Sequence, residues 1–357
     1  MLNYEVLSLD EAVDKYNGDW INLAGKSDVN VSLLPGWLNC TSQAFRIKMS
    51  VYIQKEQDHV IGIIPFYRSV TSRLGLKLTT ISTGGNLVSY HQEFITAPGH
   101  TQSVVEGFFH FLEKIKFDFF HTVAIQTDTD TYKYLNDCIT KHQMNCENHL
   151  GDSSPYFKLN TNWNEVLAAK ARKFRYKVNK RENLLTKNDN FIIRWYDDED
   201  SCDELLKFIF QIEEKSWKVN DRMDITSNKV EMNFYKLLLP FLAKNHFLDA
   251  SVLLIDNIPI AYNLCYLWNK QIGQLKTSYD TKFNDISPGA ILMEAGFRKY
   301  FNENHNEFDF LGAPMPHKLA WSKKTRKHES IYIYGKGYKA SIIFILKKFK
   351  KKLKGIQ

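Results

Sequence analysis

The feature that most restricts the fold of this chain is an order of secondary-structure elements that occurs twice. In each half, helical segments precede three strand-like segments, which are followed by a helix and one more strand. In the first half these last five segments are 47–54, 60–70, 77–82, 101–116 and 122–126. In the second half they are 249–255, 258–268, 273–279, a helix from Pro288, and 308–311. The sequence therefore predicts a duplicated α/β (α+β) fold, in which each copy is a mixed, largely antiparallel sheet flanked by helices.

The length and one break in the pattern set the expected domain boundaries. A chain of 357 residues suits two domains, and Pro155 interrupts the pattern between the halves. We expect one domain over 1–150, a second over 151–335 that ends with a strand at 330–334, and a basic amphipathic tail over 336–357. The net charge is +7, and the lysines of this tail supply nearly all of it. The nearly neutral body argues against a surface built throughout for nucleic acid.

Cysteine usage and the first residues bear on the compartment. The five cysteines are dispersed and include no CxxC pair, which favours reduced thiols over a disulfide framework or a zinc site. The first residues show no basic region followed by an apolar run, and no stretch approaches the roughly 20 apolar residues that cross a bilayer. We therefore expect a cytoplasmic protein without a bound metal.

The segment after the strand at 273–279 carries the clearest chemical signal. There Ser287, Pro288 and Gly289 open a helix. Proline in the first turn beside a small residue leaves backbone N–H groups exposed at a helix N-terminus, where a phosphate or pyrophosphate can bind. The same residues also serve as ordinary helix caps, so the motif alone leaves both interpretations open.

Several pieces of the second half, in a fixed order, extend this signal. Six of them lie within 152–321: SSPYFKL, KARKFRYKVNKRENL, EEKSWK, LLIDNIPIAYNL, SYDTKFNDISPGAILMEAGF and FDFLGAPMPHKLAW. On these pieces the chain resembles the GNAT acyltransferase superfamily, in the CelD-like branch associated with cellulose biosynthesis. The first half matches more loosely, through LLPGWL and IGIIPFY. The architecture is also similar to that of the Fem-type transferases, which pair two GNAT folds and place aminoacyl groups on peptidoglycan precursors.

The resemblance implies two tandem GNAT-like folds, of which the first is degenerate. It implies transfer of an acyl group, with acetyl expected, from acyl-CoA to an amine, and no permanently bound cofactor. Backbone N–H groups of residues 275–278 would polarise the thioester carbonyl, and the helix start would hold the CoA pyrophosphate. The expected cofactor-binding residues are Lys276, Thr277, Ser278, Lys282, Ser287, Gly289 and Ala290. The loop is poorer in basic and glycine positions than the superfamily pattern, which leaves the donor open.

Three residues are the candidates for catalysis: Tyr279, Asp280 and Glu214. A tyrosine at a strand end can protonate a thiolate, or it can simply pack on the next helix. Glu214 stands three residues before Trp217, so a carboxylate beside an indole is one interpretation and a solvated helix surface is the other. The expected substrate-binding residues are Arg172, Arg175, Trp217, Lys218, Asp309, His317, Lys318 and Trp321. Asp309 lies between apolar neighbours and needs a partner, for which Lys318 or Arg172 is available.

Two basic segments suggest anionic partners. Seven of the twelve residues from 170 to 181 are Lys or Arg, which suits a nucleotide-sugar, a lipid phosphate or a tRNA acceptor stem, or else a solvated helix face. In the tail, apolar residues recur at helical spacing between lysines: Ile342, Ile345, Leu346, Phe349, Leu353 and Ile356. Such a helix can lie on an anionic membrane at its inner face, the alternative being a disordered basic tail.

The leading functional hypothesis is an acyl-CoA-dependent N-acyltransferase. Its acceptor would be a small, lipid-linked or nucleotide-linked amine of a cell-envelope or polysaccharide precursor, such as an amino sugar. One alternative is a Fem-like transferase that takes an aminoacyl group from tRNA. The other is a non-catalytic binding module of a polysaccharide assembly, because a fold does not fix a function.

Overall fold

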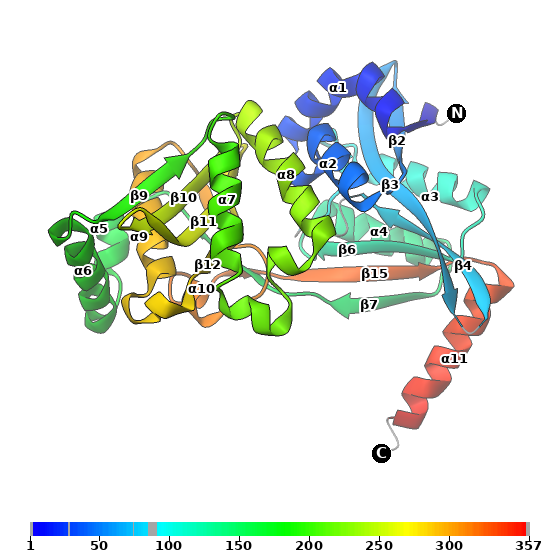
Figure 1. The fold of residues 1–357 in the computed structure, drawn as a ribbon. Helices are drawn as coiled ribbons and strands as arrows, with labels where there is room; N and C mark the ends of the chain where they lie inside the picture. Colours follow the sequence, from blue (N-terminus) through cyan, green and yellow to red (C-terminus); the bar gives the residue numbers. More distant parts are fainter. Residues whose placement is uncertain (1–2, 28, 74, 85–90, 355–357) are drawn as a thin grey trace. The chain divides into compact units, whose positions relative to one another are not determined.

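The computed structural model describes residues 3–27, 29–73, 75–84 and 91–354 (Figure 1). The chain divides into two compact units. Unit 1 comprises Met1–Ser153 and Arg326–Gln357, and unit 2 comprises Ser154–Thr325. Ile356, the last residue of the apolar pattern in the tail, lies outside the described residues. In the part of the chain that the structure describes, no helix is long and apolar enough to span a bilayer.

Unit 1 is built on a mixed sheet. Its strands are β1 (Asn3–Ser8), β2 (Met49–Glu56), β3 (His59–Arg73), β4 (Leu76–Thr83), β5 (Ile95–Thr96), β6 (Phe119–Gln126), β7 (Cys146–Leu150) and β15 (His328–Tyr334). They lie in the order β1-β2-β3-β4-β6-β15-β7, with β5 beside β3. The β4–β6 pair is parallel, and the pairs on either side of it are antiparallel.

The helices of unit 1 are α1 (Leu9–Lys26), α2 (Pro35–Phe45), α3 (Thr101–Lys114), α4 (Asp130–Lys141) and α11 (Tyr338–Lys354), with a 3₁₀ turn at Val31–Leu33. A reciprocal capping box between Ser8 and Glu11 begins α1. Helix α3 places Val104, Phe108 and Leu112 on one face by their four-residue spacing, and all three are buried in the core of unit 1.

Unit 2 is also built on a mixed sheet. Its strands are β8 (Ser154–Lys158), β9 (Phe191–Tyr196), β10 (Leu248–Ile255), β11 (Ile258–Trp268), β12 (Gln271–Tyr279), β13 (Glu307–Asp309) and β14 (Thr325–Arg326). They lie in the order β14-β8-β13-β12-β11-β10-β9. The β12–β13 pair is parallel, and the others with described registers are antiparallel.

The helices of unit 2 lie on both faces of its sheet: α5 (Trp163–Ala168), α6 (Arg172–Lys187), α7 (Cys202–Glu213), α8 (Lys229–Lys244), α9 (Pro288–Asn302) and α10 (Pro316–Leu319), with 3₁₀ turns η2 (Trp217–Asp221), η3 (Ile225–Ser227) and η4 (Thr281–Ile286). Tyr262 of β11 reaches α7, whereas Ala261 and Cys265 pack against α9. Alternate side chains of a strand point to opposite faces, so α7 and α9 cover opposite faces of the sheet.

Tight turns fix the register of the meanders. Asp256 and Asn257 both have positive φ, of 50° and 62°, and they join Ile255 to its cross-strand partner Ile258. Two consecutive left-handed residues form the primed turn that matches the twist of paired strands. Asp256 and Asn257 thus form the hairpin turn between the strands expected at 249–255 and 258–268.

The predicted duplication is confirmed as a shared order of elements. In unit 1, the antiparallel strands β2, β3 and β4 lead into α3, and β6 then pairs parallel to β4. In unit 2, β10, β11 and β12 lead into α9, and β13 pairs parallel to β12. Each unit is a mixed α/β structure whose sheet is mainly antiparallel.

The last strand belongs to unit 1, which differs from the expected domain over 151–335. Strand β15 pairs antiparallel with both β6 and β7, and buries Ile331 and Ile333. Alternation identified this segment as a strand, but alternation does not tell which sheet a strand joins. Helix α11 also belongs to unit 1, because its Ala340 and Ile343 are buried in a cluster with Leu78.

Candidate active site

The central feature of unit 2 is an irregularity in β12. Leu264 of β11 lies opposite Lys276, and the next residue, Cys265, lies opposite Gln274. Leu275 is therefore an extra residue, which forms a β-bulge. The described ladder between β12 and β13 covers Gln271–Gly273, while β12 continues to Tyr279. The two parallel strands thus separate where the bulge bends β12.

The connection from β12 to α9 ends in a strained residue. Ser287 has φ 55° and ψ 60° and precedes Pro288, the first residue of α9. Its side chain makes no cap hydrogen bond, while its backbone oxygen accepts from Ala290 and Ile291 at 3.0 and 3.2 Å. A Cβ added to Gly289 would meet the ring of Tyr279 at 3.8 Å, an ordinary contact. The position of this Cβ is therefore not crowded by other side chains.

A buried charge network supports β12 from the side of α7. Glu213 is fully buried and accepts from Lys218 Nζ at 2.9 Å, from Ile225 N at 3.1 Å and from the Tyr262 hydroxyl. Lys218 Nζ also donates to the backbone oxygen of Thr277 at 2.7 Å. The network therefore ties the end of α7 to β12 just beyond the bulge.

Burial is the main cause of the pKa shifts of Lys218 and Tyr262. It lowers the pKa of Lys218, against the opposing effect of the Glu213 carboxylate. It also raises the pKa of Tyr262 well above the ordinary value, and the Glu213 charge acts in the same direction. Tyr262 therefore stays a neutral donor toward Glu213. Near it, Lys276 of β12 pairs with Glu231 of α8 at 2.5 Å.

The predicted catalytic residues differ in their surroundings. Tyr279 is half-buried, and its hydroxyl donates to Asn284 Oδ1 at 3.1 Å. Asp280 is buried, and its Oδ1 accepts from Lys282 N at 3.0 Å as the cap of η4. Its Oδ2 lies 4.0 Å from Lys215 Nζ. The side chain of Lys282 is exposed.

Sequence reasoning selected Glu214 where the buried carboxylate is Glu213. Glu214 is exposed at the end of α7, and Trp217 is 37% exposed in the following turn. Glu213 lies four residues after Ile209 and seven after Leu206, both buried. That spacing places Glu213 on the apolar face of the helix and could have identified it. No comparable signal marked Tyr262.

A second group of predicted residues lies around β13 and α10. Asp309 accepts from Ser154 Oγ at 2.9 Å and from Leu311 N at 2.8 Å. Lys318 Nζ donates to the backbone oxygens of Phe310 and Leu311. Leu311 has φ 48°, so Asp309 and Lys318 together hold a left-handed turn after β13. His317 is exposed, and Trp321 packs edge-on against Phe297 and Phe174.

The basic segment divides into structural and exposed cations. The segment spans a break between two helices, because α5 ends at Ala168 and α6 begins at Arg172. Arg175 donates to the backbone oxygens of Ala168 and Lys170, both at 2.9 Å, across this break. Arg181 pairs with buried Glu294 of α9 through two guanidinium nitrogens. Arg172 remains exposed, whereas Arg175 serves the fold of α5 and α6.

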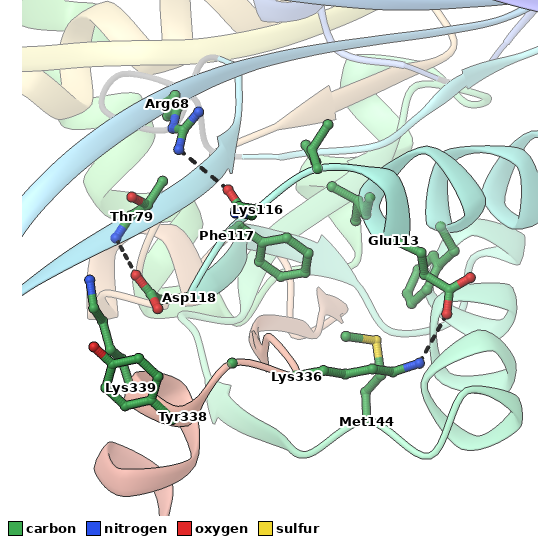
Figure 2. Close-up of a pocket in the computed structure, with 14 residues that line it drawn as sticks. Arg68, Thr79, Glu113, Lys116, Phe117, Asp118, Met144, Lys336, Tyr338 and Lys339 are labelled. Atoms are coloured by element: carbon green, nitrogen blue, oxygen red, sulfur yellow. Dashed lines mark hydrogen bonds and ion pairs between the residues drawn. The ribbon is translucent and has the colours of Figure 1, made fainter.

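The described part of unit 1 contains a cavity of about 640 Å³ (Figure 2). Apolar side chains line it together with Arg68, Lys116, Lys336 and Lys339. Arg68 donates to the backbone oxygen of Lys116 at 3.3 Å, and Lys336 pairs with Glu113 at 3.0 Å. All lining residues belong to unit 1, so this cavity is separate from the site at β12. Among the residues that the structure describes, no three His, Cys, Asp or Glu side chains are grouped to hold a metal ion.

Comparison with known proteins identifies the class of this architecture. Residues 172–319 match the family model described as an acetyltransferase (GNAT) domain. No curated protein matches the sequence. Among solved structures, the fold is similar to that of FemX, with 11% identity over 89% of this chain and 96% of that chain and a TM-score of 0.64.

Two further structures extend the likeness. A conserved protein of unknown function from Bacteroides thetaiotaomicron has 14% identity over 94% of this chain and 100% of that chain, with a TM-score of 0.59. A tandem GNAT protein from the clavulanic acid biosynthesis pathway has 9% identity over 94% and 99%, with a TM-score of 0.51. At such identities the likeness concerns the fold. The chain thus contains a region that matches a GNAT acetyltransferase domain, and its two-unit fold is similar to that of a tandem GNAT protein. The region that matches the acetyltransferase domain lies in unit 2.

Proposed function

We propose that the protein transfers an acyl group, with acetyl preferred, from acyl-CoA to an amine of a cell-envelope or polysaccharide precursor such as an amino sugar. The reaction would take place in the cytoplasm, at the inner face of the membrane. One observation carries the proposal. The bulge at Leu275 lies on the strand that leads, through η4, to the open N-terminus of α9 at Gly289. A thioester carbonyl and a pyrophosphate both require N–H donors, which a bulged strand edge and a helix N-terminus provide.

The donor would bind along this strand and loop. Backbone N–H groups of residues 275–278 would polarise the thioester carbonyl. At the start of α9, the N–H of Gly289 would face the pyrophosphate, since those of Ala290 and Ile291 already donate to the Ser287 oxygen. Ser287, Gly289 and Ala290 form this start, and Lys282 supplies a positive charge from an exposed position on η4. The bond from Lys218 to Thr277 fixes the strand edge on which the carbonyl would lie.

The transfer itself needs two proton movements. The amine nitrogen attacks the thioester carbon, and the carbon–sulfur bond breaks as the amide forms. We assign acceptance of the amine proton to Asp280 and protonation of the leaving thiolate to Tyr279, which adjoins Gly289. Glu213 and Lys218 act as positioning residues. Glu214, the third candidate for catalysis, is exposed, and we assign no proton transfer to it.

The acceptor would be recognised by the polar and aromatic groups that flank these strands. Trp217 and Arg172 are exposed, and His317 is exposed on α10. These side chains offer stacking and hydrogen bonding to a sugar or to a phosphate attached to it. Asp309 and Lys318 hold the turn that follows β13, and Trp321 packs against Phe297.

The test measures thermal unfolding with acetyl-CoA, long-chain acyl-CoA and free CoA. A ligand at about 100 times its Kd stabilises the folded state by roughly 2.7 kcal/mol. Gly289→Asp should abolish this stabilisation, because its carboxylate repels the pyrophosphate while its Cβ is sterically accepted. Gly18→Asp is the matched control, since a Cβ at Gly18 meets nothing within 4 Å and the same charge is then introduced away from the proposed site. If no CoA species stabilises the wild type, the proposal is wrong.

A second candidate function takes an aminoacyl group from tRNA. One observation favours it: Lys173, Lys177 and Lys180 are exposed at positions i, i+4 and i+7 of α6, and therefore share a face. Binding of bulk tRNA that falls steeply with salt, and that a triple replacement of these lysines by Gln weakens, would support this function. Stabilisation by CoA thioesters without tRNA binding would exclude it.

A further inference from the structure

Helix α11 has two apolar faces, of which one is used by the fold. On the first, Ala340 and Ile343 are buried, and the Phe344 ring contacts the Tyr334 ring with centroids 4.9 Å apart. Lys347 on the same side pairs with Glu147 at 2.6 Å. These contacts anchor the helix on unit 1, so its orientation on that unit is fixed by packing.

The second apolar face is exposed. Tyr338, Ile342, Ile345 and Phe349 follow one another at spacings of four, three and four residues, and Leu346 lies beside them. At 3.6 residues per turn this series forms a stripe opposite the packed face. Phe349 is 65% exposed and Ile345 is 51% exposed. Figure 1 shows α11 (red) leaving the sheet of unit 1 near the end of β4.

The charge of the helix defines what can cover this stripe. Helix α11 contains seven lysines and no acidic residue. Lys348 directly precedes Phe349, and Lys350, Lys351 and Lys352 directly follow it in the sequence. A second copy of the chain would bring these lysines together and be repelled. An anionic, apolar partner satisfies both the stripe and the charge.

The cavity of unit 1 continues the positive surface. Tyr338 and Lys339 belong both to α11 and to the cavity lining. Four cationic side chains line the cavity against two carboxylates, those of Glu113 and Asp118. The start of the helix therefore adjoins a net positive hollow with an apolar lining, which suits a phosphate headgroup next to a membrane surface.

We propose that α11 docks the protein on an anionic phospholipid membrane through the stripe Tyr338, Ile342, Ile345, Leu346 and Phe349. An amphipathic helix with lysines on its polar side lies in the plane of the interface, with its apolar residues at the acyl boundary. The lysines add attraction to anionic headgroups that salt weakens. This surface would hold the protein at a membrane. None of its residues belongs to the acyl-transfer site in unit 2.

The experiment is co-sedimentation of the full chain with vesicles of phosphatidylcholine, with and without phosphatidylglycerol, at low and high salt. Binding is expected with phosphatidylglycerol at low salt and should weaken at high salt. The double variant Ile345→Ser/Phe349→Ser should reduce vesicle partitioning at least about tenfold, because two apolar side chains no longer enter the interface. Leu150→Ser is the matched control, since Leu150 is an exposed apolar residue of β7 in the same unit.

Three results would overturn the proposal. The first is no binding to phosphatidylglycerol vesicles at low salt. The second is equal binding by the wild type and the double variant, provided that both unfold at the same temperature. The third is a lipid-free dimer of the wild type that the double variant converts to a monomer, since the stripe would then be an interface between two copies of the chain.

Discussion

The ammonium of Lys218 lies 2.7 Å from the backbone oxygen of Thr277 and 2.9 Å from the carboxylate of Glu213. One side chain therefore links the end of α7 to the strand that follows the bulge at Leu275. Since residues 275–278 are the proposed carbonyl-binding segment, the position of this segment depends on a buried ion pair.

Replacing Lys218 by Met should destabilise the protein and weaken CoA binding. The change leaves the carboxylate of Glu213 buried without its cation, and breaking a buried pair in this way costs about 3–5 kcal/mol. Urea unfolding measures the loss. Lys215→Met is the control, because Lys215 is 49% exposed and 4.0 Å from Asp280, and it should cost less than about 1 kcal/mol. Equal stability of the two variants would contradict the assignment.

The two adjacent carboxylates at the end of α7 should differ in how much the same substitution changes stability. Glu213→Gln removes a charge that Lys218 and Tyr262 both address, and should lower the free energy of unfolding by roughly 2 kcal/mol or more. Glu214→Gln changes an exposed side chain and should stay within about 0.5 kcal/mol. Urea unfolding measures the free energy of unfolding of both variants. A larger loss for Glu214→Gln would favour Glu214, the carboxylate predicted from the sequence.

Much of the fold could be predicted from the sequence, because the patterns that determine its strands and turns are local. The primed turn at Asp256-Asn257 and the apolar alternation of the strands around it are read within a few residues. The placement of β15 in the sheet of unit 1 was not accessible, since it depends on pairing with β6 across about 200 residues of chain. A strand pattern contains no information about a partner so distant.

The candidate site was only partly accessible for a related reason. The loop at 287–290 has a motif, and the structure places it at the open start of α9. The bulge at Leu275 arises because β12 has one more residue than β11 between the same two pairs. No residue type in the sequence predicts this extra residue. From the sequence, the basic segment is expected to bind an anionic ligand. In the structure, however, Arg175 donates to backbone oxygens and Arg181 pairs with Glu294. The sequence shows that a segment is charged, but it does not show with which groups these charges pair.

Tyr279→Phe should reduce turnover while preserving stability. The hydroxyl donates to Asn284, which is exposed, so its loss should change the free energy of unfolding by less than about 1 kcal/mol. If the hydroxyl protonates the thiolate, kcat should fall by about 10²-fold or more. Release of free CoA from acetyl-CoA in the presence of a panel of amino sugars measures kcat. Asn284→Ala is the control, and it should keep turnover within a few-fold. Full turnover by Tyr279→Phe would exclude the assigned proton transfer.

The stability of unit 1 should depend on pH through His121. Burial, and to a lesser extent the neighbouring His149, lowers the pKa of His121 to about 4, and its ring stacks on Tyr332 with centroids 3.8 Å apart. In the unfolded chain a histidine has a pKa of about 6.5. As the pH falls from about 6.5 to 4, the unfolded state takes up a proton that the folded state does not, so the free energy of unfolding should decrease within this window by up to roughly 3 kcal/mol. The slope should level off below pH 4, where both states are protonated. Urea unfolding across this range, compared with His121→Phe, isolates the contribution, because Phe keeps the stacked ring without titrating. The difference between wild type and variant should therefore change in favour of the variant as the pH falls, and a difference that is constant from pH 7 to 4 would show that His121 titrates normally.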